Sequence, residues 1–433
     1  MQNPPRILYL SYDGLTDPLG QSQILPYIEG LSGQGYQFTI ISFEKKDRFA
    51  SGEARINLRC SEKNIRWIPL TYTKNPPVLS TMYDTDKLYR QVKNLIDKES
   101  LDLIHCRSYI PALIALQIKK ELGIPFIFDM RGFWADERVD GKIWNLKNPV
   151  YRKVYDYFKK NERRFLEEAA AIVSLTHAGR EEIVRWFHED ERFGGISDHY
   201  NYDRASMVAK KITVIPCAAD LDLFDFTKVS VNKRKWICAV HGLDPSLEYL
   251  GYVGSLGTWY MAEDMLRLYN VIRASHPGLR FLVLTHDDTG PLRSLAVELG
   301  IPQSYIIHVV AERREVPALM CLMAASVFFI LPAYSKKASS PTKHGELMGM
   351  GIPVICNDRV GDTTDIVARY AAGHVVGNFT PAEFEKVAAN WKNITATDRK
   401  KIRAGAEEYF SLTNGIAAYA KIYKEIIEEK VFA

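Results

Sequence analysis

The 433-residue sequence has few cysteines, a weak net charge and no long apolar run. Its six cysteines include no Cys-x-x-Cys pair and mostly stand inside apolar segments, which indicates buried free thiols rather than a disulfide or metal framework. The formal net charge of +4 gives no general argument for nucleic-acid binding. The longest apolar run, residues 318–331, is shorter than the roughly 20 residues that a membrane-spanning helix needs. The first residues also lack the pattern of a signal peptide, so we expect a cytoplasmic protein.

The apolar residues that are present alternate between the periods of short strands and of longer helices. A composition of 47% hydrophobic and 25% charged residues is that of a globular protein, and the length favours two domains. Strands that alternate with helices are typical of βαβ units and a parallel sheet. In the first half, the predicted strands are residues 6–11, 38–42, 103–105, 126–128 and 172–174, and the predicted helices are residues 22–31, 85–99, 110–122, 149–170 and 178–187.

The rhythm breaks at residues 212–216, and the polar, basic stretch 225–235 is interpreted as a linker. The second half then repeats the pattern, with predicted strands opening at 252–253 and covering 280–285, 306–309, 327–331 and 353–356, predicted helices at 262–275, 292–299, 317–325 and 341–350, and a helical tail over 398–428. We therefore predict an α/β protein with two Rossmann-like, doubly wound domains that face a cleft. The predicted domains are residues 1–225 and 226–408, followed by a helix over 409–433 that packs back on the first domain. Such sheets bind ligands at the carboxyl ends of their strands.

Residues 339–346 carry the most informative motif. Ser340 is predicted to cap a helix and Pro341 to occupy its first position. The N–H groups and partial positive charge of a helix start suit a diphosphate, to which Lys343 would add a full charge. Glu346, one turn further on, is placed to accept hydrogen bonds from two ribose hydroxyls. The same residues also fit an ordinary capped helix in which Glu346 only balances the helix dipole.

This motif resembles the nucleotide-binding block of GT-B glycosyltransferases of the large retaining family 4. The similarity rests on Ser-Pro-Thr-Lys-x-x-Glu at 340–346 and on Met-Gly-Met-Gly-Ile-Pro-Val-Ile at 348–355. Members of the family carry a Glu-x7-Glu pattern, whose second glutamate is Glu346 here and whose first position holds Ala338. In the family the first glutamate meets the donor sugar. The resemblance therefore implies a nucleotide site and leaves the donor sugar open.

Two further blocks extend the resemblance over nearly the whole chain. Residues 212–224 are similar to the Ile-Pro-Asn-Gly-Val-Asp block that ends the first domain of the family, and residues 250–257 to the first strand and loop of its second domain. The second similarity implies that the backbone N–H groups of Gly254 and Ser255 face the donor phosphates.

Positive charge for the departing diphosphate must come from outside that loop. The family often has an arginine and a lysine in and after the loop, and this sequence has neither. We expect the charge to be balanced by Lys343, by the helix dipole or by another arginine. Arg313 and Arg314 are candidates, although both also fit ordinary surface arginines.

The first domain carries two motifs that the resemblance connects to function. The family has a glycine-rich turn after its first strand that admits the donor diphosphate, and Gly20 matches it best. Residues 128–134 resemble the (Glu/Asp)-x-Arg-x-x-Trp stretch of some members, at the rim of the acceptor side. This implies that Asp129 orients an acceptor hydroxyl and that Arg131 meets an anionic group. A structural ion pair of Arg131 with Asp129 or with Asp136 is the alternative.

Histidines and acidic pairs give weaker signals. His105 and His177 stand at predicted strand ends, where each could face the cleft or serve only the structure. Asp-x-Asp pairs occur at 84–86 and 220–222, but no group of histidine, cysteine and carboxylate residues has the spacing of metal ligands. We predict that the protein needs no metal ion.

The resemblance implies an enzyme that transfers a sugar from a UDP- or GDP-linked donor to a glycan or lipid-linked acceptor, with retention and without a cofactor, in surface polysaccharide or glycoconjugate biosynthesis. It assigns donor binding to Gly20, Gly254, Ser255, Ser340, Pro341, Thr342, Lys343 and Glu346, and catalysis to Asp129, Arg131 and Lys343. No nucleic acid is expected as a partner. Two alternatives stay open: another GT-B nucleotide-sugar enzyme, such as an epimerase, and a non-catalytic nucleotide-binding assembly subunit.

Two segments have two interpretations each. The basic residues of the helix over 149–170 could contact anionic lipid at the inner face of a membrane. Four acidic residues on the same helix also fit a solvent-exposed face of mixed charge. Residues 186–206 are interpreted as an irregular insertion, which is either an acceptor-side flap or a long loop. The sequence does not indicate an oligomeric state.

Overall fold

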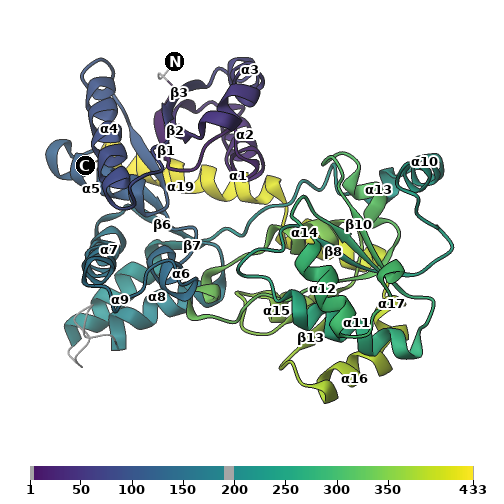
Figure 1. The fold of residues 1–433 in the computed structure, drawn as a ribbon. Coiled ribbons are helices and arrows are strands. Elements are labelled where there is room, and N and C mark those ends of the chain that lie inside the picture. Colours follow the sequence, from purple (N-terminus) through teal and green to yellow (C-terminus); the bar gives the residue numbers. More distant parts are fainter. Residues whose placement is uncertain (1–3, 190–198, 433) are drawn as a thin grey trace. The chain divides into compact units, whose positions relative to one another are not determined.

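The computed structural model describes residues 4–189 and 199–432, which form two compact units (Figure 1). Unit 1 spans Met1–Pro216 together with Leu412–Ala433, and unit 2 spans Cys217–Ser411. Unit 1 is therefore built from two separate stretches of chain, and unit 2 is inserted between them.

Unit 1 is organised around a seven-stranded sheet in the order β3-β2-β1-β4-β5-β6-β7, in which every neighbouring pair is parallel. The first six strands have the order of a doubly wound Rossmann sheet. The central strands are almost wholly buried, as expected where helices cover both faces. The strands are β1 (Arg6–Ser11), β2 (Gln37–Glu44), β3 (Arg66–Thr71), β4 (Leu103–Arg107), β5 (Phe126–Asp129), β6 (Ala171–Ser174) and β7 (Ile212–Val214).

The helices of unit 1 connect these strands. Helices α4, α5 and α7 lie side by side, and α8 packs against α9. The helices are α1 (Pro18–Gln23), α2 (Leu25–Ser32), α3 (Lys46–Glu62), α4 (Leu79–Ile96), α5 (Tyr109–Leu122), α6 (Trp134–Asp140), α7 (Pro149–Glu168), α8 (His177–Glu189) and α9 (His199–Lys211).

The last helix of the chain, α19 (Leu412–Phe432), completes unit 1 by packing on α2 and β4, and it is drawn in yellow among the purple and blue elements of Figure 1. A Cβ added to Gly30 of α2 would lie only 2.3 Å from Cδ1 of Ile416, and one added to Gly415 would lie 2.7 Å from Cε1 of Tyr27. The two helices therefore approach more closely than a larger residue at either glycine would allow.

Unit 2 repeats the same architecture with a six-stranded parallel sheet in the order β10-β9-β8-β11-β12-β13. The strands are β8 (Tyr249–Val253), β9 (Arg280–Leu284), β10 (Ile306–Val309), β11 (Met323–Phe328), β12 (Val354–Asn357) and β13 (Gly373–Val376). The α-helices are α10 (Val231–His241), α11 (Ala262–Ser275), α12 (Gly290–Glu298), α13 (Val316–Met320), α14 (Thr342–Gly349), α15 (Thr363–Tyr370), α16 (Pro381–Ala389), α17 (Trp391–Thr395) and α18 (Arg399–Tyr409), and the short 3-10 turns are η2 (Phe226–Lys228), η3 (Gln303–Tyr305) and η4 (Tyr334–Ala338).

The prediction of two Rossmann-like α/β domains is confirmed, since both sheets are parallel and helices connect their strands. The bounds predicted from sequence for β1, β10 and α11 are those of the structure. Strand β3 was not predicted because Pro69 interrupts its pattern. A proline is tolerated there because β3 lies at the edge of the sheet.

The apolar stretch before α14 was divided wrongly. A helix was predicted over 317–325 and a strand over 327–331, whereas α13 ends at Met320 and β11 begins at Met323. Strand β11 lies in the centre of the sheet, between β8 and β12, and is buried on both faces. A continuous apolar run of this kind has no period that separates a buried helix from a buried strand.

The predicted linker over 225–235 was also wrong, because it contains the start of a regular helix. The Ser230 hydroxyl accepts a hydrogen bond from the Lys233 N–H and caps α10. The division between the units falls at 216/217 rather than at 225/226. The intervening segment packs within unit 2, where Ala219 donates a backbone hydrogen bond to Phe410 (3.0 Å) and Arg403 donates to the carbonyl oxygen of Leu221 (3.2 Å).

The helical tail is divided between the units. Helix α18 belongs to unit 2 and α19 to unit 1, so the second division falls at 411/412, where 408/409 was predicted.

The segment 186–206 is helical at both of its described ends, where an irregular insertion was predicted. Trp186 lies in α8 and is buried against Phe133, and α9 begins at His199. Residues 190–198, which include Gly194 and Gly195 of the predicted flap, lie outside the described residues.

In the described part of the chain, no helix is both long enough and apolar enough to cross a membrane.

Replacing Tyr423 of α19 by alanine should lower the free energy of unfolding by about 3 to 5 kcal/mol, the range for deleting a buried aromatic side chain. Tyr423 is fully buried, its ring packs against Tyr36 and Phe38, and its hydroxyl lies 2.6 Å from Nδ1 of His105. Tyr423→Phe removes only the hydroxyl and should cost about 1 kcal/mol. Urea unfolding followed by circular dichroism measures both effects.

The matched control is Lys421→Ala on the same helix, where the lysine side chain is 78% exposed, and it should leave the unfolding curve unchanged. If Tyr423→Ala unfolds at the same urea concentration as the parent protein, α19 does not complete the core of unit 1.

Candidate functional site

Helix α14 begins one residue later than the sequence predicted. Thr342 is its first residue and Pro341 is the residue that caps it, so the assignment of Ser340 as the cap was wrong. The Ser340 hydroxyl instead accepts a hydrogen bond from the backbone N–H of Cys217 (3.2 Å). No side chain caps the helix. The N–H groups of its first turn have no partner within the helix.

Lys343, in the first turn of α14, is half-buried and packs against two aromatic side chains. Its Nζ lies 3.7 Å from the ring centre of Tyr260 and 4.5 Å from that of Tyr252, and it donates a hydrogen bond to the Tyr252 hydroxyl (3.2 Å). Desolvation lowers the pKa of Lys343 to about 7, although the carboxylate of Glu346 opposes this shift. The charge of this lysine is therefore much harder to maintain than that of an exposed lysine.

Glu346 lies one turn further along α14 and pairs with an arginine from another segment. The carboxylate is largely buried, and Nη2 of Arg313 lies 3.0 Å from its Oε1. Burial raises the pKa of Glu346, an effect that Arg313 opposes. The Arg313 guanidinium also lies over the ring of Phe224, at 5.1 Å from its centre. Of the two candidate arginines, Arg313 is therefore the one that the structure brings to α14, since Arg314 contacts Lys233 through its carbonyl oxygen.

The loop that follows β8 differs from its prediction in one respect. The N–H of Gly254 was expected to face a phosphate, but it donates to the carbonyl oxygen of Leu284 (2.9 Å) and continues the pairing of β8 with β9. Gly254 has a φ of +116°, and a Cβ there would lie 3.0 Å from Nζ of Lys343. The prediction for this N–H group is wrong. The residue instead leaves room for the lysine.

Asp287 holds the same loop in place. Its carboxylate accepts hydrogen bonds from the Ser255 hydroxyl and from the Leu256 N–H, both at 2.7 Å. These hydrogen bonds lower the pKa of Asp287, so that the carboxylate is ionised at neutral pH. A carboxylate therefore occupies donors that would otherwise suit a phosphate. Asp287 was not predicted as a site residue, although the run Thr285-His-Asp-Asp288 directly follows β9.

Other members of the site were also missed. Tyr252 and Tyr260 pack against Lys343, but the sequence pattern indicates only a strand residue and a loop residue at these positions. The only available signal was the density of aromatics in Gly251-Tyr-Val-Gly-Ser-Leu-Gly-Thr-Trp-Tyr260. Ala338, which stands where the family has a sugar-contacting glutamate, is buried at the end of η4 and offers no polar side chain.

In unit 1, Gly20 lies in helix α1, where it packs against the turn that follows β1. A Cβ at this position would lie 2.1 Å from the carbonyl oxygen of Gly14, so any larger residue would displace the turn. The nearby N–H groups of Leu15 and Thr16 donate to the buried carboxylate of Glu44, at 2.7 and 3.0 Å. Donor binding by Gly20 stays a prediction.

Asp129 and Arg131 lie together at the carboxyl end of β5. Asp129 is 1% exposed, Nη1 of Arg131 lies 3.8 Å from its Oδ1, and the Tyr419 hydroxyl of α19 donates to its Oδ2 (3.0 Å). The basic neighbours, Arg131 first, lower the pKa of this carboxyl against the effect of burial. This geometry fits the structural ion pair. The roles of Asp129 and Arg131 toward an acceptor stay predictions, and burial of the carboxylate weighs against direct contact with an acceptor.

His105 belongs to the same buried cluster, and burial lowers its pKa. Its Nδ1 contacts the Tyr423 hydroxyl, and its Nε2 lies 3.5 Å from Asp129 Oδ2, which matches the structural interpretation of this histidine. His177 is exposed at the first residue of α8. Asp136 pairs with Lys159 (2.8 Å) and not with Arg131.

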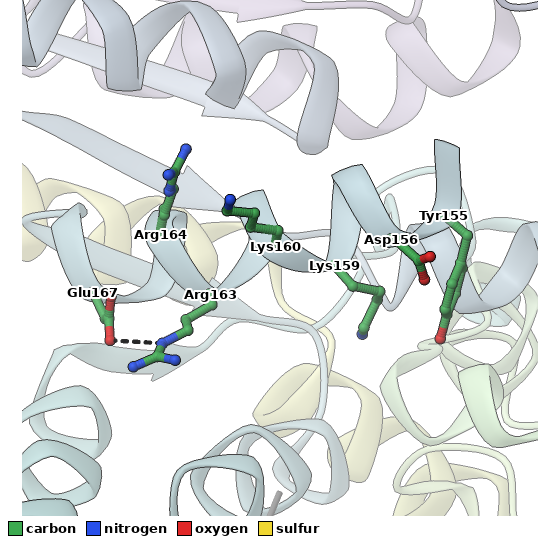
Figure 2. Close-up of a pocket in the computed structure, with 7 residues that line it drawn as sticks. All are labelled: Tyr155, Asp156, Lys159, Lys160, Arg163, Arg164 and Glu167. Carbon is green, nitrogen blue, oxygen red and sulfur yellow. Dashed lines mark hydrogen bonds and ion pairs between the residues drawn. The ribbon is translucent and has the colours of Figure 1, made fainter. Parts of the chain in front are cut away.

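A hollow of about 520 Å³ follows one side of α7 and is lined by charged residues (Figure 2). Arg163 in this hollow pairs with Glu167 at 3.1 Å, as the dashed line in Figure 2 marks. Lys160 and Arg164 stand one turn apart and are exposed. The lining residues are Tyr155, Asp156, Lys159, Lys160, Arg163, Arg164 and Glu167.

Within the two described stretches of the chain, no group of three or more histidine, cysteine, aspartate or glutamate residues could hold a metal ion. Of the two Asp-x-Asp pairs, Asp84 lies inside α4 and is fully buried, where it accepts hydrogen bonds from Tyr12 and Thr73. Metal independence stays a prediction.

Comparison with known proteins places this geometry in a wider context. Residues 23–193 match the model of Glycosyltransferase Family 4. The chain is 21% identical over 327 residues to a D-inositol 3-phosphate glycosyltransferase of Segniliparus rotundus, and this match covers 73% of the chain and 65% of the length of that relative.

Solved structures resemble the chain over almost its full length. A glycosyltransferase from Rickettsia africae superposes with a TM-score of 0.67 at 15% identity and covers 98% of this chain and 99% of its own. The Anabaena protein HepE, solved in complex with UDP and glucose, superposes with a TM-score of 0.65 at 13% identity, over 96% of this chain and 98% of its own. These likenesses confirm the fold, and the match to the family 4 model extends over residues 23–193.

Replacing Asp287 by alanine should release the loop that follows β8. The variant loses both hydrogen bonds that fix Ser255 and Leu256, so the Leu256 amide should exchange with deuterium at least about tenfold faster, which corresponds to about 1.4 kcal/mol of local stability. Hydrogen exchange measured by mass spectrometry tests this. The matched control is Asp288→Ala, whose carboxylate accepts a hydrogen bond from the Gly290 N–H (2.9 Å), and it should leave the Leu256 amide unchanged. Equal exchange in the parent and in Asp287→Ala would show that the carboxylate does not hold the loop.

Proposed function

We propose that this chain, which matches the family 4 model over residues 23–193, transfers a sugar from a UDP- or GDP-linked donor to a glycan or lipid-linked acceptor. The nucleotide site that we propose is the amino-terminal half of α14 with the loop that follows β8. The support from known proteins is the bound UDP of HepE and the glycosyl-transfer activity named for the Segniliparus relative.

One observation carries the proposal: α14 presents a lysine and a glutamate to the same region, one turn apart. Lys343 lies against Tyr252 and Tyr260 in the first turn, and Glu346 is held by Arg313 in the second. A lysine at a helix start is suited to a diphosphate, because the helix dipole and the ammonium act in the same direction. A carboxylate fixed by an arginine is suited to accept hydrogen bonds from two ribose hydroxyls.

The chemistry that we propose is sugar transfer with retention, following the family resemblance. The bond between the anomeric carbon and the diphosphate breaks, a bond forms from that carbon to the acceptor oxygen on the same face, and the acceptor proton passes to the leaving phosphate. The contribution of the protein is to position the substrates and to stabilise the charge that develops on the diphosphate. Lys343 and the start of α14 are the groups that we assign to that charge. The step needs no metal ion in this proposal.

We further propose that the protein binds to an anionic membrane surface and encounters its acceptor there. Three of the four acidic residues that dilute the charge of α7 are engaged: Glu162 is buried beside Lys159, Glu167 pairs with Arg163, and Glu168 pairs with Lys119. The charged residues of α7 that remain exposed are Arg152, Lys153, Lys160 and Arg164 with Asp156 as the acidic member, and the apolar side chains of Val150 and Tyr157 are exposed as well. A basic helix face with exposed apolar groups favours anionic lipid.

Replacing Lys343 or Glu346 by alanine should weaken nucleotide-sugar binding at least about tenfold, since each change removes a charged group, which contributes about 1.5 to 3 kcal/mol per hydrogen bond. A thermal-shift series with UDP-, GDP-, CMP- and dTDP-sugars first identifies the nucleotide, and calorimetry then gives Kd. Turnover of the sugar that binds should fall with binding in both variants.

The matched control is Lys392→Ala, an exposed lysine of unit 2 outside the site, and it should bind like the parent protein. The proposal fails if the parent turns over no nucleotide sugar and if neither variant loses UDP or GDP binding.

Reversing two charges on α7, in the double variant Lys160→Glu/Arg164→Glu, should reduce binding to vesicles that contain about 30% phosphatidylglycerol by at least about tenfold, because each basic residue near an anionic surface contributes about 1 kcal/mol. Co-sedimentation at low and high salt measures this, and vesicles of phosphatidylcholine alone should not bind. Lys421→Glu/Lys424→Glu on α19 makes the same change in net charge at two exposed lysines and should bind like the parent. Equal loss in both double variants would attribute the binding to net charge rather than to α7.

A further inference from the structure

We propose that at pH 7 and above a large fraction of the free protein holds Lys343 as a neutral amine, and that this amine takes up a proton from solvent when the diphosphate of a nucleotide sugar binds. The inference rests on the proposed function, because it assumes that α14 binds a diphosphate. It adds a property that the function does not require, namely that donor binding is coupled to proton uptake.

The enclosure of the lysine is the first observation. Its Nζ lies against the rings of Tyr260 and Tyr252, at 3.7 and 4.5 Å from their centres, and against Gly254, where even an added Cβ would lie at 3.0 Å. The amine donates a hydrogen bond to the hydroxyl of Tyr252, which itself donates to the carbonyl oxygen of Ser255. Aromatic faces attract an ammonium only weakly compared with the water that they replace.

The charges around the lysine are the second observation. In the described part of the chain, no carboxylate lies within 4.0 Å of Nζ of Lys343. Glu346, one turn along the same helix, is paired with Arg313, and Asp287, which acts on the Tyr252 hydroxyl, is held by Ser255 and Leu256.

The remaining titratable groups that face this region act on the lysine indirectly. Asp220 raises the pKa of Glu346, and burial raises the pKa of the hydroxyls of Tyr252 and Tyr260, so both tyrosines are neutral at and around neutral pH. The nearest anions are thus occupied by other partners, and desolvation lowers the pKa of Lys343 to about 7.

A bound diphosphate changes this balance because it places two negative charges beside the amine. An opposite charge within a few ångströms favours the charged form and moves the pKa of the lysine back toward its ordinary value. With a pKa of about 7 in the free protein, roughly half of the molecules carry the neutral amine at pH 7 and about nine in ten at pH 8. Binding must then draw a proton from solvent.

The sign of the pH dependence follows from this linkage. The bound state holds more protons than the free state above pH 7, so affinity falls as pH rises, by up to tenfold per pH unit until the pKa of the bound state is reached. Below about pH 6 the free protein already carries the ammonium, and affinity should be constant. Glu346 is the competing site of proton uptake, since burial raises its pKa and a nearby diphosphate would raise it further.

The test is calorimetry with UDP-glucose, or with the tightest-binding sugar of the thermal-shift series, at pH 6.0 and 8.0 in buffers of different ionisation enthalpy. A nucleotide sugar is the right probe because its diphosphate is esterified at both ends, whereas the terminal phosphate of UDP titrates near pH 6 itself. The expected uptake is about 0.1 proton per ligand at pH 6.0 and about 0.9 at pH 8.0.

Three variants isolate the group that takes up the proton. Lys343→Arg stays charged at every pH and should bind with an uptake below about 0.1 proton at pH 8.0. Lys343→Met should bind at least about tenfold more weakly and also without uptake. Glu346→Gln should bind more weakly but keep the full uptake, which distinguishes the lysine from the glutamate.

The outcomes separate the inference from the function on which it rests. Binding by the parent without proton uptake at pH 8.0, or equal uptake by Lys343→Arg, overturns the inference and leaves the transferase proposal intact. Loss of the uptake in Glu346→Gln alone assigns the proton to the glutamate and also overturns it. If no nucleotide sugar of the series binds, the proposed function itself is wrong.

Discussion

Burial of both faces of two parallel sheets is the constraint on which the structure depends. Parallel strands need crossover connections, and those crossovers supply the helices that cover the faces. In unit 1 the connecting helices leave one part of the sheet uncovered, beside α2 and over β4. Helix α19 covers this part with Tyr419 and Tyr423. The same arrangement directs the loops after the strands to one edge of each sheet, and the candidate site residues come from these loops and from the helix that follows one of them.

The sequence predicted most of this framework because its signals are local. Strands β1 and β10 and helix α11 have clear apolar periods and clear ends, and the structure has them at the predicted residues. The errors arose where the local sequence pattern does not distinguish a helix from a strand or a loop. The central strand β11 is apolar throughout, so its boundary with α13 depends on pairing with β8 and β12, which no short window contains. The two lysines and one arginine at the start of α10 obscured its helical pattern, and the Ser230 cap was the signal that could have identified the helix.

The candidate site was only partly predictable, for a physical reason. The motif at 340–346 predicted a helix start with Lys343 and Glu346, and the structure has both on α14. The groups that decide their chemistry come from distant segments: Arg313 precedes α13, Tyr252 and Tyr260 flank the loop after β8, and Asp287 follows β9. A sequence motif identifies the residues that share a helix, whereas a pKa is set by whatever folds against that helix. The cluster around Asp129 illustrates the same limit, because its burial depends on Tyr419, 290 positions further along the chain.

The return of α19 to unit 1 also has a consequence for the order in which the chain is made. During synthesis, residues 1–216 leave the ribosome well before Leu412. The surface beside α2 therefore stays uncovered while the whole of unit 2 is synthesised. Unit 2 is continuous in sequence and can fold as soon as its own residues are synthesised. Unit 1 reaches its final packing only after α19 has been synthesised. For this protein, the completion of unit 1 is therefore tied to the synthesis of the whole of unit 2.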